Sequence, residues 1–327
     1  MQLNRQTVSI CMCTYNGAAY LRELLESILS QSQLPDEIII YDDHSVDETS
    51  NILQEYMDMS QNIRWVFHKN SENVGWRENF KRCMEHATGD IVFLCDQDDI
   101  WDSQKIEIMS AAFRDNHSIG LLSSGYRPLV MQGAHETNLK SRSTHTKEIK
   151  KVELAPRGFY YTVGCTYAFR KSLIAPFVKC WDPEIAHDGL LWYLALSTDS
   201  LYRIDYEALL FRRHENNASS HPCMKKNSLE MRDYIEGKIN RQQRVIERIK
   251  QCVPLSKEAT KLLNSMGQWY ELRKKLFLKG RLIDFVRLYS YRKYYSSYKN
   301  YLCEANAIIY RKRKGNGNSK SSKSSLS

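Results

Sequence analysis

The chain has 327 residues, of which 42% are hydrophobic and 26% are charged, and its formal net charge is +9. That composition is typical of a globular protein with one large domain and an appendage, or with two domains. The sequence contains no run of about 18 apolar residues, which excludes a transmembrane helix, and its N-terminus lacks the apolar core of a secretory signal.

The nine cysteines are irregularly spaced, and no two form a Cys-x-x-Cys pair. Several lie in apolar runs that are typical of strands: Cys11, Cys13, Cys95 and Cys165. This pattern favours reduced, buried thiols in a cytoplasmic protein over disulfides or zinc ligands.

Charge divides the chain into two parts. Residues 231–327 contain 23 Lys and Arg against 7 Asp and Glu, a net charge of +16. The first 230 residues contain 24 basic and 31 acidic residues, a net charge of −7. An acidic body and a basic C-terminal region indicate two surfaces with different partners.

The first 100 residues alternate between strand and helix patterns. Apolar and β-branched runs predict strands at residues 7–13, 37–41, 63–67 and 91–95. Helical periodicity begins at Ala18, a second helix ends near Met57, and a third follows Gly75. This order, with its short connections, predicts a parallel, doubly wound sheet.

Three of these strands end in polar clusters: Thr14-Tyr15-Asn16, Asp42-Asp43 and Asp96-Gln97-Asp98-Asp99. The carboxyl ends of parallel strands share one sheet edge, so the clusters are expected to line one crevice. Neighbouring carboxylates repel one another unless a cation offsets them, as a divalent cation shared with a phosphate does. The structural alternative is a solvated turn or a helix N-cap, although Ser103 is expected to cap the next helix.

No G-x-G-x-x-G motif follows the first strand and no Walker lysine is present, which argues against a Rossmann dinucleotide site and a P-loop. Five other short motifs together carry a family resemblance. They are Thr14-Tyr15-Asn16, Asp42-Asp43-His44-Ser45-x-Asp47-x-Thr49, Asn73-x-Gly75, Gly89-Asp90 and Asp96-x-Asp98-Asp99-x-Trp101. Together they resemble the nucleotide-binding half of an inverting family 2 glycosyltransferase of GT-A fold, in the bacterial rhamnosyltransferase-like branch. His44 stands where that family more often has glycine.

The resemblance implies functions for several residues. Those that would contact the nucleotide-sugar are Thr14, Tyr15, Asn16, Asp42, Asp43, Arg77 and Asp96. Asp96 would also lie near the metal, and Asp98 would ligate Mg²⁺ or Mn²⁺ that bridges the diphosphate.

The centre of the chain is less regular. It predicts a strand at residues 119–126, a polar loop at 132–151 and a strand at 158–169 that contains Gly164-Cys165-Thr166, similar to a segment of the rhamnosyltransferase-like branch. His187-Asp188-Gly189 opens an apolar helix, and a carboxylate there is typical of an N-cap. The resemblance instead makes Asp188 the general base that deprotonates an acceptor hydroxyl.

A strand predicted at residues 201–210 leads into Phe211-Arg212-Arg213-His214-Glu215-Asn216-Asn217, which is similar to the family's Arg-x-His-x-Asn-Asn segment. His214 would complete the metal site or donate to the diphosphate. Arg212 or Arg213 would offset charge on the leaving group, with Arg213 also assigned to the nucleotide-sugar.

The C-terminal region is basic and is predicted to be helical. An amphipathic helix runs from about Leu229 to Val253 and is stopped by Pro254, and helical patterns continue through residues 261–281 and 282–310. Three interpretations remain open: a helical cap with a solvated face, a peripheral anchor on an anionic membrane, and a nucleic-acid arm in which tyrosines stack on bases.

The sequence therefore predicts a GT-A catalytic domain at residues 1–225, with a mostly parallel sheet between helices, a basic helical appendage at 226–310 and a disordered tail at 311–327. The predicted reaction is metal-dependent, inverting transfer from a nucleoside-diphosphate sugar to a hydroxyl of a glycan or lipid-linked acceptor. The resemblance places it in synthesis of bacterial cell-surface polysaccharide (O-antigen or capsule), in the cytoplasm or peripherally on the inner face of the plasma membrane.

Two alternatives stay open at this point. One is a sugar-1-phosphate nucleotidyltransferase, against which the lack of cations in the first loop argues. The other is a non-enzymatic nucleic-acid-binding protein, against which the acidic body argues. The donor sugar, the acceptor and the oligomeric state do not follow from the sequence, although the resemblance suggests deoxythymidine-diphosphate rhamnose as donor.

Overall fold

The structure is a computed structural model that describes residues 5–134, 143–156, 162–215, 217, 228–295 and 297–305, with side chains of the helix beginning at Ser228 described from residue 236. The chain divides into two compact units, and each is described by itself. The first unit comprises residues 1–153 and 161–222, and the second comprises residues 154–160 and 223–327.

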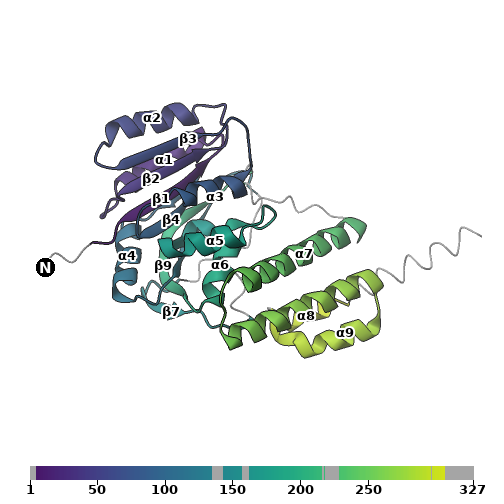
Figure 1. Ribbon diagram of the computed structural model, residues 1–327. Helices are drawn as coiled ribbons and strands as arrows, with labels where there is room; N and C mark the ends of the chain where they lie inside the picture. Colours follow the sequence, from purple (N-terminus) through teal and green to yellow (C-terminus); the bar gives the residue numbers. More distant parts are fainter. Residues whose placement is uncertain are drawn as a thin grey trace, which may run out of the picture. The chain divides into compact units, whose positions relative to one another are not determined.

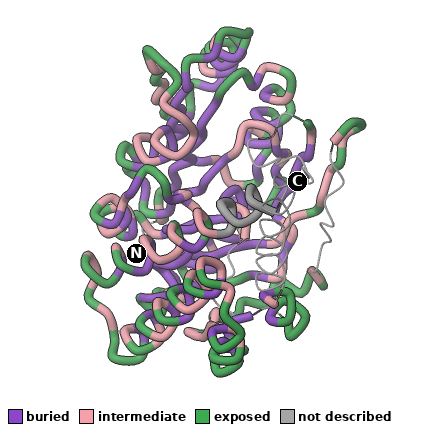
Figure 2. Tube along the Cα trace, turned by 90° about the vertical axis from the view of Figure 1, so that its right-hand side faces the viewer, coloured by how far each residue is buried: buried purple, intermediate pink, exposed green. Residues whose placement is uncertain are grey.

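The first unit is built on one sheet (Figure 1). Its first four strands are β1 (Val8–Thr14), β2 (Glu37–Asp42), β3 (Arg64–Lys69) and β4 (Ile91–Asp96), which are parallel and ordered β3-β2-β1-β4. Every residue of β1 and β2 is buried. This confirms the predicted parallel sheet. Figure 2 shows how buried residues, in purple, are distributed along the trace of the chain.

The other half of the sheet is mixed. It contains β5 (Ile100–Trp101), β6 (Leu121–Val130), β7 (Ile149–Lys151), β8 (Tyr167–Arg170) and β9 (Leu201–Arg213). Strand β8 runs antiparallel to both β4 and β6, while β6 and β9 are parallel to one another. Because β9 also pairs with β5, its end at Arg213 lies next to the loop that follows β4.

Helices cover both faces of this sheet (Figure 1). On one face lie α1 (Ala18–Leu29), α2 (Thr49–Met59) and α4 (Lys105–Asp115), whose buried side chains belong to one core cluster. On the other lie α3 (Trp76–Glu85), α5 (Ile174–Cys180) and α6 (His187–Ser197). The side chain of Gln31 joins the end of α1 to α4, because its Nε2 donates to Asp102 O (2.7 Å) and its Oε1 accepts from Ile106 N (3.1 Å).

Three local expectations were wrong. Ser103 does not cap α4: the N-cap is Gln104, and Asp102 Oδ1 accepts from Gln104 N (3.0 Å), which makes the turn before the helix. The strand expected at 158–169 begins only at Tyr167, after a short 3₁₀ turn (Gly164–Thr166), while residues 157–161 lie outside the described residues. The loop expected at 132–151 contains strand β7, because Lys150 pairs with Arg203 of β9.

The second unit is helical, with α7 (Ser228–Cys252), α8 (Lys257–Lys279), α9 (Leu282–Leu288), a 3₁₀ segment (Tyr289–Tyr294) and α10 (Tyr298–Cys303). Helix α8 begins at a Ser256 cap that accepts from Ala259 N and ends at Gly280 in the left-handed conformation (φ 62°). The helix predicted across residues 282–310 is broken after Leu288, and the predicted tail at 311–327 lies outside the described residues. None of the helices in the described ranges has the length and apolar character needed to span a bilayer.

Candidate active site

The loops after β1, β2 and β4 meet at one sheet edge, as predicted. Asp43 N donates to Thr14 O (2.8 Å), which holds the second loop against the first. Tyr15 N donates to Gln97 Oε1 (2.8 Å), and Gln97 Nε2 donates back to Tyr15 O (3.0 Å), which holds the first loop against the third. Tyr15 is itself 49% exposed, so its ring is available to a ligand.

Asp42 holds the turn between the first two loops. Its Oδ2 accepts from Thr14 Oγ1 (2.8 Å) and Ser45 Oγ (2.5 Å), and its Oδ1 accepts from Ser45 N (2.8 Å). Asn16 joins the same turn, because its N donates to Ser45 Oγ and its Oδ1 accepts from Val46 N. The predicted nucleotide contacts of Thr14, Asn16 and Asp42 stay predictions, since their polar side chains already shape the loops.

Asp43 anchors a third segment. Its Oδ1 accepts from Asn70 Nδ2 (2.9 Å) and Val74 N (2.8 Å), and its Oδ2 accepts from Gly75 N (2.9 Å). His44, the residue that follows Asp43, adopts φ 65°, which lies in the left-handed region that glycine favours. The turn therefore keeps its form although histidine stands at that position.

Asp98 contacts two residues that lie far from it in the sequence, His214 and Asn217. Its Oδ2 lies 2.9 Å from His214 Nε2 and accepts from Asn217 Nδ2 (2.7 Å). The His214 ring also lies 4.7 Å from the ring of Tyr20 on α1. The structure thus brings together two of the three predicted metal ligands, Asp98 and His214, and adds Asn217, which belongs to the same matched motif but had no predicted function.

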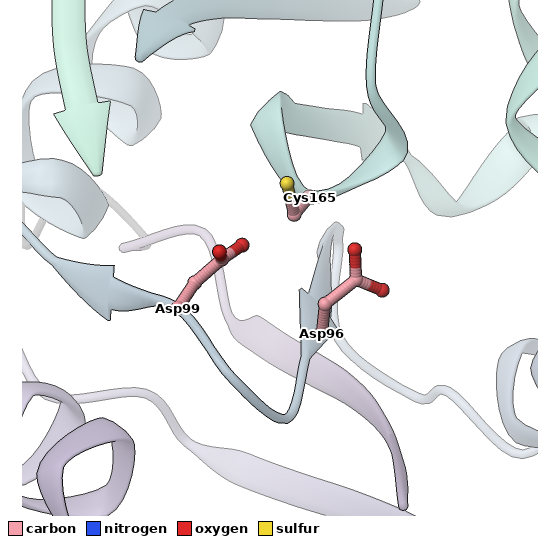
Figure 3. Close-up of side chains that lie close together, drawn as sticks. All are labelled: Asp96, Asp99 and Cys165. Carbon is pink, nitrogen blue, oxygen red and sulfur yellow. The ribbon is translucent and has the colours of Figure 1, made fainter. Parts of the chain in front are cut away.

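Asp96, the third predicted ligand, lies with a different pair. The ligand atoms of Asp96, Asp99 and Cys165 all lie within 4.8 Å of one another (Figure 3). Burial raises the pKa of Asp96 to about 7, and the charges of Asp98 and Asp188 add to that rise. Burial, with the charges of Asp98 and Asp96, also raises the pKa of Asp99 well above its usual value. A cation or a proton is needed to stabilise these acids.

Lys105, for which no sequence pattern predicted a function, lies beside this cluster. It is 0% exposed, its Nζ donates to Cys165 O (2.9 Å), and the Nζ lies 3.5 Å from the centre of the Trp101 ring. Burial lowers its pKa to about 8, although the Cys165, Cys95, Asp99 and Asp96 groups act to raise it. A buried lysine next to buried acids is a counter-charge inside the fold.

Asp188 occupies the first turn of α6, but it is not an N-cap. The cap position is Ala186, and Asp188 Oδ1 accepts from Gly189 N (2.6 Å). Burial raises the pKa of Asp188 to about 6, while hydrogen bonds from the backbone and the charge of Arg77 act to lower it. A carboxylate with that pKa is ionised at neutral pH and can accept a proton, as a general base must.

The surroundings of Asp188 are closely packed. A Cβ built on Gly164 would lie 3.0 Å from Asp188 Cβ and 3.3 Å from His187 Nε2. The neighbouring His187 ring stacks on Phe80 (4.1 Å between centroids), and burial lowers the pKa of His187 to about 3, so it is neutral. Arg77, predicted to contact the nucleotide, lies on α3 with its guanidinium 4.3 Å from the Trp76 ring.

The two arginines at the end of β9, Arg212 and Arg213, make different contacts. Arg212 is 3% exposed, and its guanidinium donates to Asp98 O (2.8 Å) and Glu23 Oε2 (2.7 Å), while its backbone N donates to Asp99 Oδ1 (3.1 Å). Arg212 therefore fixes the acidic loop. Arg213 lies 5.4 Å from the ring of Phe211, and its predicted contact with the nucleotide-sugar stays a prediction.

Comparison with known proteins identifies the class. Residues 9–175 match the family described as "Glycosyl transferase family 2", and the chain belongs to that family. It is a glycosyltransferase, and its relatives include proteins of bacterial polysaccharide synthesis. The dTDP-rhamnosyl transferase RfbG of Shigella flexneri is 26% identical over 227 residues, covering 63% of this chain and 72% of that protein. The putative teichuronic acid biosynthesis glycosyltransferase TuaG of Bacillus subtilis is 32% identical over 126 residues, covering 38% of this chain and 49% of that protein.

Solved structures show the fold. TarS 1-349 of S. aureus in complex with UDP-GlcNAc matches with a TM-score of 0.61 and 18% identity, covering 85% of this chain and 77% of that one. The mannosyltransferase PcManGT of Pyrobaculum calidifontis, in complex with GDP-Man and Mn2+, matches with a TM-score of 0.52 and 15% identity, covering 94% of this chain and 86% of that one. The fold is that of GT-A glycosyltransferases, as the sequence predicted.

Proposed function

We propose that this chain is an inverting glycosyltransferase that moves a sugar from a nucleoside diphosphate to a hydroxyl of a glycan or lipid-linked acceptor. The observation that carries the proposal is the meeting of Asp188 with the acidic loop. Both lie beside one turn, because a Cβ on Gly164 would lie 3.0 Å from Asp188 Cβ, and the sulfur of the next residue, Cys165, lies within 4.8 Å of ligand atoms of Asp96 and Asp99. A base and a diphosphate-binding loop at one edge are what a direct displacement requires.

In the proposed mechanism, Asp188 accepts the proton of the acceptor hydroxyl as that oxygen forms its bond to the anomeric carbon. The bond between that carbon and the diphosphate oxygen breaks on the opposite face, which inverts the configuration. Asp188 is suited to this step because its pKa of about 6 leaves it ionised but basic near neutral pH. Glycine at residue 164 leaves room for this side chain, because a Cβ there would lie 3.0 Å from Asp188 Cβ.

We propose Mg²⁺ or Mn²⁺ as the cofactor, held by Asp98, Asp96 and His214. The chemistry of this donor set fits a hard cation, since two of its three members are carboxylates from one short loop and the third, His214, has its Nε2 2.9 Å from Asp98 Oδ2. When bound, such a cation supplies charge that stabilises the leaving diphosphate. Asn217 and Arg212 hold the acidic loop in place for it.

The test is release of nucleoside diphosphate from a panel of nucleotide sugars, with Mn²⁺, Mg²⁺ or EDTA present. The name of the Shigella relative makes deoxythymidine-diphosphate rhamnose the first donor to try. We expect metal-dependent release from one donor, lost in Asp98→Ala and retained in Asp115→Ala, whose side chain is exposed at the end of α4. Equal rates in EDTA and in Mn²⁺ would contradict the metal-dependent mechanism.

We also propose that the second unit places the enzyme on the inner face of the plasma membrane. Eleven large hydrophobic residues are exposed in the described chain, and six of them lie between residues 282 and 302: Leu282, Ile283, Val286, Tyr289, Tyr298 and Leu302. From residue 279 to 302 there are six Lys and Arg, and the one acid, Asp284, is buried. An apolar helix face with basic flanks suits an anionic bilayer surface.

Sedimentation of the full chain with vesicles tests this assignment. We expect binding to phosphatidylglycerol vesicles, weaker at high salt, and reduced at least tenfold by Ile283→Asp with Val286→Asp. Met59→Asp is the matched control, because Met59 is also exposed but lies on α2. Equal loss in both variants, or equal binding to neutral phosphatidylcholine, would contradict it, and retention on DNA instead would favour the nucleic-acid interpretation.

A further inference from the structure

The second unit contains a hollow of about 330 Å³, called here the basic pocket. Its walls come from the 3₁₀ segment, from α10 and from the residues that join them. They include two cations, two tyrosines and two serines, and no acid: Ser290, Arg292, Lys293, Tyr295, Ser297 and Tyr298. A concave surface with that charge attracts an anion.

The two cations of the basic pocket are not neutralised by the part of the chain that the structure describes. Arg292 Cζ lies 4.9 Å from the centre of the Tyr289 ring, and Lys293 Nζ lies 5.4 Å from the centre of the Tyr294 ring. Neither cation has a hydrogen bond or an ion pair with a described group. Two like charges that share one pocket repel one another, and a bound anion removes that cost.

The acids of the same segment are used elsewhere. Between residues 279 and 305 the chain has two acids, Asp284 and Glu304, which are 0% and 5% exposed. Asp284 accepts from Arg281 Nε (2.9 Å), and Glu304 accepts from Arg273 Nε (2.7 Å). This segment therefore supplies no anion to the basic pocket.

The basic pocket also has hydroxyl groups that are free to donate. Ser297 Oγ accepts from Asn300 N (3.2 Å), which leaves its own hydrogen for another acceptor. Tyr298 is 60% exposed, and its hydroxyl has no hydrogen bond with a described group. A guanidinium, an ammonium and two hydroxyls form a donor set that suits the oxygens of a phosphate, since arginine binds phosphate through two parallel hydrogen bonds.

Apolar side chains adjoin this donor set. Tyr298 lines the basic pocket and is also one of the large hydrophobic residues exposed between residues 282 and 302. Tyr289, whose ring lies against Arg292, is another. A phosphate in the pocket would thus have exposed apolar groups next to it, which suits a phosphate attached to an acyl or isoprenyl chain better than a free ion.

We propose that the basic pocket binds the terminal phosphate of a lipid, either a phosphomonoester or a diphosphate. A terminal phosphate carries a charge of about −1.5 to −2 at neutral pH, which matches the two cations, whereas the phosphodiester of phosphatidylglycerol carries a single charge. Two kinds of lipid present such a group: a phospholipid such as phosphatidic acid, and an isoprenyl diphosphate. The inference rests on the proposed function, in which the acceptor is lipid-linked and the second unit meets the membrane.

The test measures binding of the full chain to three kinds of vesicle in EDTA. They contain phosphatidic acid, geranylgeranyl diphosphate or phosphatidylglycerol and are matched in surface potential, which removes the general attraction of a basic surface to an anionic bilayer. We expect wild type to bind at least one of the two terminal-phosphate lipids about fivefold or more tightly than phosphatidylglycerol. The lipid that binds more tightly identifies the source of the phosphate. Equal binding to all three would overturn the proposal.

Paired variants separate the pocket from general charge. Arg292→Gln with Lys293→Gln should abolish the preference for a terminal phosphate. Lys279→Gln with Arg287→Gln is the matched control, because it removes the same charge from exposed positions of the same unit that do not line the pocket. The control should bind all three vesicles more weakly and keep the preference. Loss of the preference in both paired variants, or in neither, would overturn the assignment to the pocket.

A soluble probe distinguishes failure of this inference from failure of the proposed function. Calorimetry with dihexanoyl phosphatidic acid in EDTA needs neither a bilayer, a sugar donor nor a metal at the acidic loop. We expect binding to wild type and about tenfold weaker binding to Arg292→Gln with Lys293→Gln, even if the enzyme released no nucleoside diphosphate or did not bind phosphatidylglycerol vesicles. Absence of binding would overturn the pocket, and equal affinity for inorganic phosphate would overturn the lipid as its ligand.

Discussion

His214 Nε2 lies 2.9 Å from Oδ2 of Asp98, which is 116 residues earlier in the chain. The pair joins the end of β9 to the loop after β4, and Asn217 Nδ2 donates to the same oxygen. Because removing a group that ligates or orients a metal ligand typically costs 10–100-fold in metal affinity, we expect His214→Ala to raise the Mn²⁺ concentration needed for half-maximal activity by about that factor. His117→Ala, at an exposed histidine after α4, should leave it unchanged. Equal metal dependence in the two variants would show that His214 does not act at the metal.

The pH dependence of kcat/KM should report Asp188. Burial raises its pKa to about 6, and a general base acts only when deprotonated. Activity should therefore be constant above about pH 7 and fall about tenfold for each unit below pH 6. A profile that stays flat from pH 5 to 8, with the fold intact by circular dichroism, would contradict the assignment.

Gly164→Ala should lower kcat more than it changes donor affinity. The added Cβ would lie 3.0 Å from Asp188 Cβ, so the base must shift by a few tenths of an ångström. Misplacing a catalytic group by about 1 Å costs on the order of 100-fold, and we expect a loss of about threefold to tenfold here. Gly267→Ala is the control, since a Cβ on that α8 residue meets no atom within 4 Å. It should stabilise the protein by roughly 0.5–1 kcal/mol.

Lys105→Met should destabilise the first unit. The substitution removes the donor to Cys165 O and the counter-charge that interacts with Asp99. Leaving buried polar groups unpaired costs about 1–3 kcal/mol each, measurable as a lower midpoint of urea unfolding. Lys171→Met is matched to it, because Lys171 Nζ also donates to a backbone carbonyl, that of Thr88 (3.2 Å), but at the surface. If both variants unfolded at the same urea concentration, Lys105 would have no structural function.

The sequence predicted most where local pattern decides structure. The buried runs of β1, β2 and β4 have no polar alternation, which is typical of parallel strands covered on both faces, and their ends had to meet at one edge. Asp98 and His214 could be paired from the motif resemblance, although no local rule brings them together.

What the sequence did not predict depends on distant contacts. Lys105 opens a helix, where a lysine usually faces solvent, and its burial follows from the Gly164–Thr166 turn 60 residues further along. The sequence could not show whether Asp42 and Asp43 hold loops or bind a nucleotide, because a carboxylate with either function looks the same in sequence. Their hydrogen bonds to Ser45 and Gly75 exist only in the fold.

Asp188→Asn tests the central claim most directly. The amide keeps the shape of the side chain but cannot accept the proton of the acceptor hydroxyl, so we expect kcat to fall about 10²–10⁴-fold. The dissociation constant of the donor, measured by calorimetry with Mn²⁺, should change less than about threefold. We expect both results together, with a product of inverted anomeric configuration from wild type. A nearly unchanged kcat, or a loss of donor affinity that explains the whole decrease, would contradict it.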